Sequence, residues 1–252
     1  MRLSRLEIAS ESNLGRIRRN NEDFHRVVVQ PTPLGNLVLL AVADGMGGTE
    51  AGEWASKLAI EGMTDALRAY AQQLAMGRST IPPLMVMERA FRLAQHRILR
   101  EAERTPERRG MGTTLTALLL SEWNFQAALG HVGDTRAYRW RSGNWEQLTQ
   151  DHSWVAQQVR QGVLSPSEAE VHPWRHMLTH ALGLKEVQPE FQQLTFLRGE
   201  VLVVATDGLY TLVPPEEWRI GQDLHASLID WVNRALLRGG SDNITAIAVR
   251  FI

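Results

Sequence analysis

The sequence predicts an α+β fold in which β-sheets are sandwiched by helices. Two long segments, 55–70 and 84–98, carry apolar residues at the three- and four-residue spacing of an amphipathic helix. Other segments, such as 37–43 and 201–205, are almost wholly apolar, which suits strands covered on both faces. The chain has 252 residues, with no internal repeat and no linker between two parts. We therefore expect a single domain over residues 1–252.

The remaining elements follow in order. Pro83 suits the start of the second helix. Segments 113–120, 123–132 and 137–148 have the pattern of a meander, with a hairpin turn at 141–144, and 243–252 has the pattern of a final strand. Segment 151–183 is less regular and contains a helix start, with Ser165 as cap and Pro166 at the first helical position. We expect it to form a small helical flap inserted among the strands.

Composition excludes several classes of function. The chain has 27 basic and 28 acidic residues, so no nucleic-acid partner is expected. It has no cysteine, which excludes disulfides, thiolate metal ligands and a cysteine nucleophile. The N-terminus has no signal-peptide pattern, and no apolar run approaches ~18 residues, the length that spans a membrane. We therefore expect a cytoplasmic protein without a membrane anchor.

Acidic residues stand at the ends of predicted strands in four separate parts of the chain. Asp44 ends one apolar run, Asp207 follows another, Asp242 precedes the last strand, and Glu22 and Asp23 stand at the entrance of an early strand. Poorly solvated carboxylates cost roughly several kcal/mol unless they are paired or bind a cation. Clustered carboxylates can hold two Mg²⁺ or Mn²⁺ ions about 3.5–4 Å apart. The pattern favours such a site, although an Asp-Gly pair after a strand is more often a plain turn.

Two further residues fit a cation and phosphate site. Gly45 follows Asp44 and lets the backbone approach closely, so that its carbonyl can bind a metal. Arg18 lies four residues before Glu22, and its planar guanidinium suits bidentate contact with phosphate. On composition alone, the basic run around Arg18 is better interpreted as a solvated surface.

Seven motifs in one order resemble the PP2C-type (PPM) serine/threonine phosphatases, particularly the short bacterial members. They cover essentially the whole chain and are GRIRRNNED (15–23), ADGMGG (43–48), MGTT (111–114), GHVGDTR (130–136), LTQDHS (148–153), DGL (207–209) and SDN (241–243). The resemblance implies a four-layer α/β/β/α sandwich, in which two antiparallel sheets are flanked by helices, with the flap at about 151–183.

The resemblance also implies an activity. The expected reaction is hydrolysis of phosphoserine and phosphothreonine in proteins, by direct attack of a hydroxide that bridges two Mn²⁺ or Mg²⁺ ions. Asp44 would bridge both ions, with the Gly45 carbonyl on one, while Asp207 and Asp242 would hold the other. Asp134, together with Asp207, would form a third metal site.

The resemblance assigns three residues to catalysis. Arg18 would bind the substrate phosphate and stabilise the transition state. Glu22 would act on the metal shell through water, and Asp23 would hydrogen-bond the bridging water and serve as base. Met46 departs from many relatives, which carry a histidine there as acid for the leaving group, so the identity of that acid stays open. The implied partners are phosphorylated proteins and a Ser/Thr kinase that the enzyme opposes in signalling.

Alternatives remain open at this point. A non-catalytic binding module on the same scaffold would lack a metal aspartate, and none of the matched acids is missing. A hydrolase of small phosphate esters would share the site. His172, His176 and His180 have the spacing of a zinc site on a helix, but a polar flap surface is the favoured interpretation. The sequence does not settle the substrate, the preferred metal, serine against threonine, or the oligomeric state, for which a monomer is the default.

Overall fold

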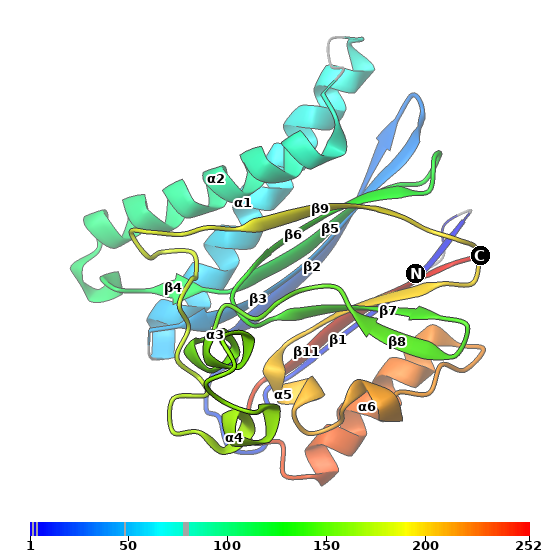
Figure 1. The fold of residues 1–252 in the computed structure, drawn as a ribbon. Helices are drawn as coiled ribbons and strands as arrows, with labels where there is room; N and C mark the ends of the chain where they lie inside the picture. The colour runs from blue at the N-terminus through cyan, green and yellow to red at the C-terminus, as the bar shows by residue number, and fades with distance from the viewer. Residues whose placement is uncertain (2, 4, 48, 78–80) are drawn as a thin grey trace.

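Two antiparallel sheets stack face to face between helices in the computed structural model, which describes residues 1, 3, 5–47, 49–77 and 81–252 (Figure 1). The five-stranded sheet has the order β1-β11-β10-β7-β8, and the other has the order β2-β3-β5-β6-β9, with β4 paired to β3. Helices α1 and α2 cover one outer face, and α6 with the short α5 covers the other. This arrangement confirms the predicted α+β sandwich.

The five-stranded sheet comprises β1 (Leu6–Asn13), β7 (Arg136–Arg141), β8 (Asn144–Gln147), β10 (Val201–Ala205) and β11 (Ile244–Phe251). The other sheet comprises β2 (Asp23–Thr32), β3 (Gly35–Met46), β4 (Gly112–Thr113), β5 (Leu115–Ser121), β6 (Gln126–Val132) and β9 (Glu190–Thr195). The helices are α1 (Thr49–Ala75), α2 (Pro83–Arg104), α3 (Trp154–Arg160), α4 (Pro166–Val171), α5 (Asp207–Tyr210) and α6 (Leu224–Leu237), with 3₁₀ turns η1 (Pro106–Arg108) and η2 (Pro215–Glu217).

Three apolar clusters hold the four layers together. One lies between the sheets, where alternate residues of β3 such as Val38, Leu40 and Val42 meet β10 and β11. The other residues of β3 face α1 and α2 on the opposite side. A strand buried on both faces has no polar side, which explains why segment 37–43 is a continuous apolar run.

The second outer layer depends on α6, a helix that the sequence analysis did not predict. Asp223 caps it by accepting the backbone N–H groups of His225 and Ala226. Leu224, Leu228 and Trp231 then repeat at helical spacing and are fully buried against the five-stranded sheet. This cap and spacing were the signal in the sequence.

The predicted meander is wrong as one run of neighbouring strands. Its first part forms the paired strands β5 and β6 of one sheet, whereas its last part forms the β7–β8 hairpin of the other sheet. Trp140 and Trp145 are directly opposed across the β7–β8 hairpin, and its turn places Ser142 and Gly143 at φ 51° and 90°. The predicted strand 113–120 is broken at Thr114. Here the backbone N–H donates to the Asp44 carbonyl at 2.9 Å, and the hydroxyl accepts the Asp44 N–H at 3.0 Å. The break therefore serves to hold the end of β3.

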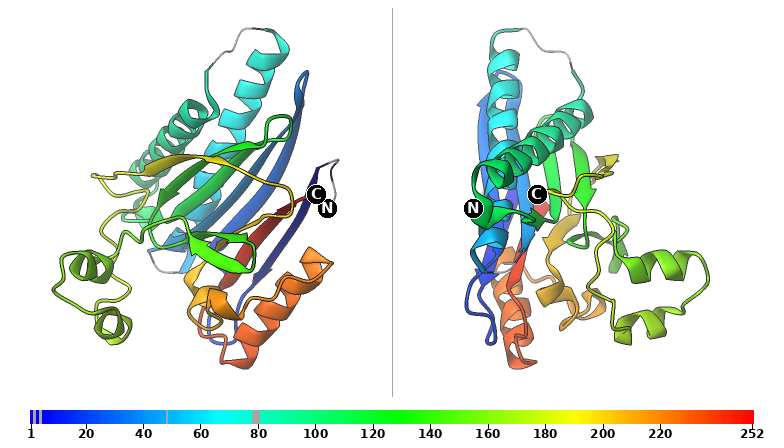
Figure 2. Two further views of the ribbon diagram at one scale, coloured as in Figure 1. Left: turned by 45° about the vertical axis from the view of Figure 1, so that its right-hand side comes forward. Right: turned by 90° about the vertical axis from the view of Figure 1, so that its left-hand side faces the viewer.

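Segment 151–183 carries two short helices that project from the sheets in both views of Figure 2. Ser165 caps α4 in a capping box with Glu168, as the sequence predicts. The rings of Trp154 and Trp174 pack edge to face with centroids 4.9 Å apart, and Trp174 keeps 53% of its surface exposed. The flap is thus held partly by its own aromatic contacts.

We expect Trp231→Ala to lower the free energy of unfolding by about 3–5 kcal/mol, because it removes a fully buried ring. The Trp231 ring stacks on Trp218 with centroids 5.0 Å apart, and its Nε1 donates to the Arg219 carbonyl. Urea unfolding measures the change. Leu237→Ala on the same helix is the control, since Leu237 is 78% exposed and should change stability by less than about 0.5 kcal/mol. Equal losses in the two variants would refute this account of the α6 layer.

Candidate active site

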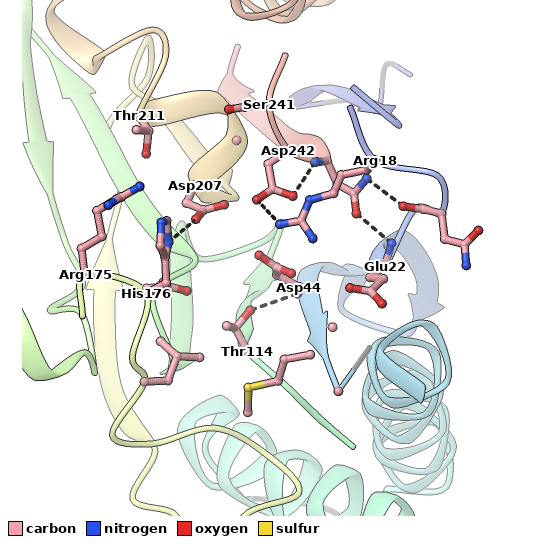
Figure 3. Close-up of a pocket in the computed structure, with 18 of the residues that line it drawn as sticks. Arg18, Glu22, Asp44, Thr114, Arg175, His176, Asp207, Thr211, Ser241 and Asp242 are labelled. Atoms are coloured by element: carbon pink, nitrogen blue, oxygen red, sulfur yellow. Dashed lines mark hydrogen bonds and ion pairs between the residues drawn. The ribbon is translucent and has the colours of Figure 1, made fainter. Parts of the chain in front are cut away.

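An acidic cavity opens where the ends of both sheets meet, with a volume of about 680 Å³ (Figure 3). Its lining includes most of the predicted site residues, namely Arg18, Glu22, Asp44, Gly45, Asp134, Asp207 and Asp242. These residues come from segments spread over the whole chain. The structure therefore brings together the carboxylates that the sequence analysis could only place at separate strand ends.

Asp23 lies behind this lining, where it is almost fully buried. It stands directly opposite Asp44 in the β2–β3 register. Its Oδ2 accepts a hydrogen bond from the Thr206 hydroxyl at 3.0 Å. Asp23 therefore touches the site from the interior of the sandwich rather than from the open side.

Close backbone packing positions the acids. A Cβ on Gly208 would lie 2.0 Å from the Asn243 carbonyl oxygen, and a Cβ on Gly45 would lie 2.1 Å from the Gly52 carbonyl oxygen. Neither position has room for a side chain. Each aspartate thus precedes a glycine because the next residue touches a neighbouring backbone, which brings Asp207 beside the Asp242 loop and Asp44 beside α1.

The carboxylates repel one another when no cation is present. Burial, followed by the charges of neighbouring aspartates, raises the pKa of Asp44 and Asp134 well above the usual aspartate value. Burial and the charge of Asp242 also raise the pKa of Asp207. For Asp23, burial raises the pKa to about 7. Such a set of acids is stable as carboxylates only if positive charge is supplied.

The donor set fits hard cations. Within the described ranges, Asp23 Oδ1 and Asp207 Oδ1 are buried oxygens without a hydrogen-bond partner, so lone pairs are available for a cation. No group of three or more His, Asp or Glu side chains is already gathered as a ligand set among those residues. Backbone carbonyls and waters supply much of the coordination of Mg²⁺ in proteins, so a preformed group of three carboxylates is not required.

Arg18 and Glu22 occupy the open side of the cavity. The Arg18 Nη2 donates to Asp242 Oδ2 at 2.7 Å, and this hydrogen bond raises the pKa of Arg18. The Glu22 N–H donates to Asn243 Oδ1 at 2.9 Å, and burial raises the pKa of its carboxyl. The Arg18 side chain is about half exposed, so its guanidinium remains accessible from solvent.

Three flap residues line the cavity, namely Arg175, His176 and Leu178, and the sequence analysis named none of them as a site residue. Arg175 and His176 approach the cavity from the side opposite Arg18 (Figure 3), and His176 Nδ1 lies 3.8 Å from Asp207 Oδ2. The only sequence signal was the density of histidine and arginine in 172–180. His172 instead packs against Trp154 with the two rings tilted, and His180 contacts His152. The three histidines thus have separate neighbours and are not gathered into one site.

We expect the metal-free protein to lose stability as the pH rises. An aspartate whose pKa is raised by folding binds its proton more tightly in the folded chain, so the folded state holds more protons than the unfolded state. For Asp23 this difference spans the window from the ordinary aspartate pKa of 3.8 to about 7. Urea midpoints in chelator should therefore fall across this window because of the buried acids.

In the Asp23→Asn variant, the urea midpoint in chelator should change less with pH than in the wild type. Asp230→Asn, at an exposed position on α6, should keep the wild-type change with pH. Saturating Mn²⁺ should reverse the trend, since cations favour the ionised carboxylates. A wild-type midpoint that rises with pH as steeply in chelator as in Mn²⁺ would contradict the electrostatic account.

Comparison with known proteins agrees with this geometry. The family model described as "Protein phosphatase 2C" matches residues 19–244. The chain is 34% identical over 245 residues to "Serine/threonine protein phosphatase PstP" of Mycobacterium tuberculosis, covering 96% of this chain and 44% of that protein. It is 31% identical to "Protein phosphatase PhpP" of Streptococcus pneumoniae, covering 97% of both. The chain thus spans less than half the length of PstP but nearly all of PhpP.

Solved structures show the same fold. The crystal structure of the Mycobacterium tuberculosis serine/threonine phosphatase PstP/Ppp aligns with a TM-score of 0.84 at 32% identity, covering 98% of this chain and 99% of that one. The PstP catalytic domain in complex with two manganese ions aligns with a TM-score of 0.82 at 32% identity, covering 98% and 99%. Because the family model matches most of this chain, the chain belongs to the protein phosphatase 2C family.

Proposed function

We propose that the protein hydrolyses phosphoserine and phosphothreonine esters in proteins, using two Mn²⁺ or Mg²⁺ ions and, at Asp134, a third. One observation carries the proposal. Carboxylates from distant segments meet in one cavity with Arg18 at its open side, and Asp23 and Asp207 each have a buried carboxylate oxygen without a hydrogen-bond partner among the described residues. The names of PstP and PhpP, and the two manganese ions in the PstP complex, support it.

The residues that would hold the cations line the cavity. Asp44 and the Gly45 carbonyl would contribute from the end of β3, Asp207 and Asp242 from the ends of β10 and β11, and Asp134 from the loop after β6. Bound cations would supply the acidification of water and the neutralisation of charge on phosphate oxygens. Carboxylates and carbonyls are oxygen donors of the kind that these ions prefer.

The chain's own residues would complete the reaction. The Arg18 guanidinium would exchange its contact with Asp242 for two contacts with phosphate oxygens, which stabilises charge in the transition state. Asp23, which lies directly behind the cavity opposite Asp44, would accept a proton from the attacking water. Glu22 would orient water at the cavity wall. Met46 also lines the cavity and cannot protonate the leaving alcohol, so that proton must come from another group.

The wider assignments belong to the same proposal. Phosphorylated proteins would be the substrates, a Ser/Thr kinase would provide the opposing reaction, and the chain would act as one domain and as a monomer. Among the described residues no helix is both long enough and apolar enough to cross a membrane. The absence of cysteine suits a reducing compartment, which supports a cytoplasmic location.

Phosphate release in the presence of Mn²⁺, Mg²⁺ or a chelator tests the proposal. We expect Mn²⁺- or Mg²⁺-dependent turnover of p-nitrophenyl phosphate and of phosphoserine and phosphothreonine peptides, and none in chelator. Small phosphorylated metabolites serve as competing substrates. Binding of phosphopeptides without turnover would identify a binding module, and preference for the metabolites would identify a small-ester hydrolase; either result would overturn the proposal.

A further inference from the structure

A bidentate ion pair joins the base of the flap to the five-stranded sheet. Arg136 is the first residue of β7, and Asp151 lies just before the flap helices. The Arg136 Nε donates to Asp151 Oδ1 at 2.8 Å and its Nη2 to Oδ2 at 2.7 Å. Only 27% of the Arg136 side chain and 13% of the Asp151 side chain are exposed. A fork-to-fork pair with this little exposure fixes both distance and orientation.

The flap side of this pair is held by further hydrogen bonds. The Asp151 carbonyl accepts from Arg160 Nη1 at 3.3 Å, and Arg160 ends the flap helix α3. The next residue, His152, donates its N–H to the Gly133 carbonyl at 2.8 Å, and its Nδ1 accepts the Gly133 N–H at 3.2 Å. The base of the flap is therefore bonded directly to the residue before Asp134.

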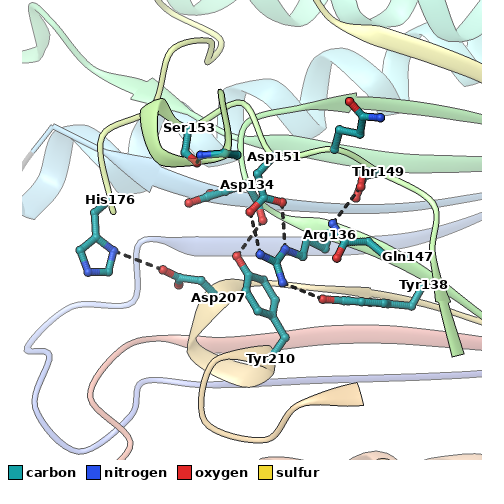
Figure 4. A network of polar contacts seen from close by, with 12 residues as sticks. Asp134, Arg136, Tyr138, Gln147, Thr149, Asp151, Ser153, His176, Asp207 and Tyr210 are labelled. Atoms are coloured by element: carbon teal, nitrogen blue, oxygen red, sulfur yellow. Dashed lines mark hydrogen bonds and ion pairs between the residues drawn. The ribbon is translucent and has the colours of Figure 1, made fainter. Parts of the chain in front are cut away.

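The cavity side of the pair runs through Tyr210. The Arg136 guanidinium lies 4.0 Å from the centre of the Tyr210 ring. The Tyr210 hydroxyl donates to the backbone carbonyl of Asp134 at 2.9 Å. Figure 4 shows Arg136 between Asp151 and Tyr210, with Asp134 and Asp207 next to them. Asp134 and the flap are thus fixed by contacts that share one arginine.

We propose that Arg136 is a positioning residue whose contacts with Asp151 and Tyr210 form a clasp that sets the flap base and the Asp134 loop in one fixed arrangement. The flap arm is Arg136–Asp151, and the cavity arm is Tyr210–Asp134. Arg175 and His176 reach the cavity from the flap, so the clasp would also affect substrate binding, and this part of the proposal rests on the proposed function. The effect of the clasp on the position of the flap does not rest on it.

The chain offers a matched pair of variants to test the flap arm. Arg136→Lys keeps the charge but loses the planar fork. Arg139→Lys is the control, since Arg139 also lies on β7 and donates through Nε and Nη2 to a carboxylate, Glu146, but on the exposed hairpin away from the flap. Thermal unfolding in chelator establishes that both variants are folded.

Limited trypsin digestion measures how firmly the flap is held, since Arg160 and Arg175 are exposed cleavage sites within it. We expect Arg136→Lys to raise the rate of cleavage at these sites by about tenfold or more, because an ammonium cannot make both parallel contacts with Asp151 that hold the flap base in place. Arg139→Lys should digest like wild type. With phosphopeptides, Arg136→Lys should raise KM more than it lowers kcat. Folded Arg136→Lys that digests like Arg139→Lys would overturn the flap arm.

Tyr210→Phe tests the cavity arm and keeps the ring beneath Arg136. It should leave flap cleavage at the wild-type rate and weaken the weakest Mn²⁺ site by about tenfold, as loss of an outer hydrogen bond to a metal site does. Calorimetric titration with Mn²⁺ measures this without turnover. Unchanged Mn²⁺ affinity would overturn the cavity arm. If the wild-type chain proves inactive on every phosphoester, the proposed function fails, whereas the digestion still decides whether the clasp exists.

Discussion

Asp207→Asn should reduce Mn²⁺-dependent hydrolysis of phosphothreonine peptides by more than about a hundredfold. Loss of an outer-shell partner already costs about 10–100-fold in metal affinity or activity, and a direct ligand should cost more. Asp207 lies at the start of α5, has a buried oxygen without a partner among the described residues, and faces Asp242 in the cavity. The asparagine keeps the shape but removes the charge that a cation needs. Initial rates over a range of Mn²⁺ concentrations measure the loss.

Although Asp207→Asn should lose activity, it should not lose stability in the absence of metal. Removing one of several mutually repelling carboxylates should leave the urea midpoint in chelator equal to or above that of wild type, while abolishing most of the stabilisation by Mn²⁺. Asp230→Asn on the exposed surface of α6 should match wild type in both measurements. An Asp207→Asn variant that is folded and remains as active as Asp230→Asn would show that the carboxylate cluster is not the catalytic centre.

Arg18→Ala should lower kcat/KM for phosphopeptides by about 10²–10³, the range found when one donor to developing charge is removed. Arg18→Lys should recover only part of the loss, because an ammonium cannot make the two parallel contacts of a guanidinium. Mn²⁺ affinity should not fall, because the substitution frees the Asp242 oxygen that Arg18 holds. Steady-state kinetics and calorimetric Mn²⁺ titration separate these effects.

Arg16→Ala is the matched control for Arg18. Arg16 is an exposed arginine two residues earlier in the same basic run and does not appear in the cavity lining. Its loss should change kcat/KM by less than about twofold, as expected for an exposed charge. Equal losses at Arg16 and Arg18 would instead indicate that the run acts through its general charge, as the solvated-surface interpretation holds.

The sequence could predict the acids that line the cavity because their signals are local. Asp44 lies near the end of β3 and Asp207 follows β10, both of which are buried strands, and each aspartate precedes a glycine that a neighbouring backbone requires. That these acids converge in one cavity follows from the arrangement of the two sheets and could not be predicted from the local pattern. The family motifs then supplied the roles that position alone does not assign.

Other features depend on contacts across the fold and could not be read from local pattern. Arg175 and His176 reach the cavity only because the irregular flap turns back toward it. The break at Thr114 arises from hydrogen bonds to Asp44, which is distant in sequence. In the sequence, Asp23 is one more acid at a strand end, but its position behind the cavity follows from its pairing opposite Asp44. In each case tertiary contacts decided the outcome.

The cavity is shared between the two sheets. Asp23 and Asp44 belong to β2 and β3, whereas Asp207 and Asp242 flank β10 and β11 of the other sheet. A cation bound between these pairs would link the two sheets, and its release would remove that link and allow the sheets to separate more easily. Backbone amides of β3 and β11 near the site should then exchange with solvent more slowly in Mn²⁺ than in chelator, and in step with each other.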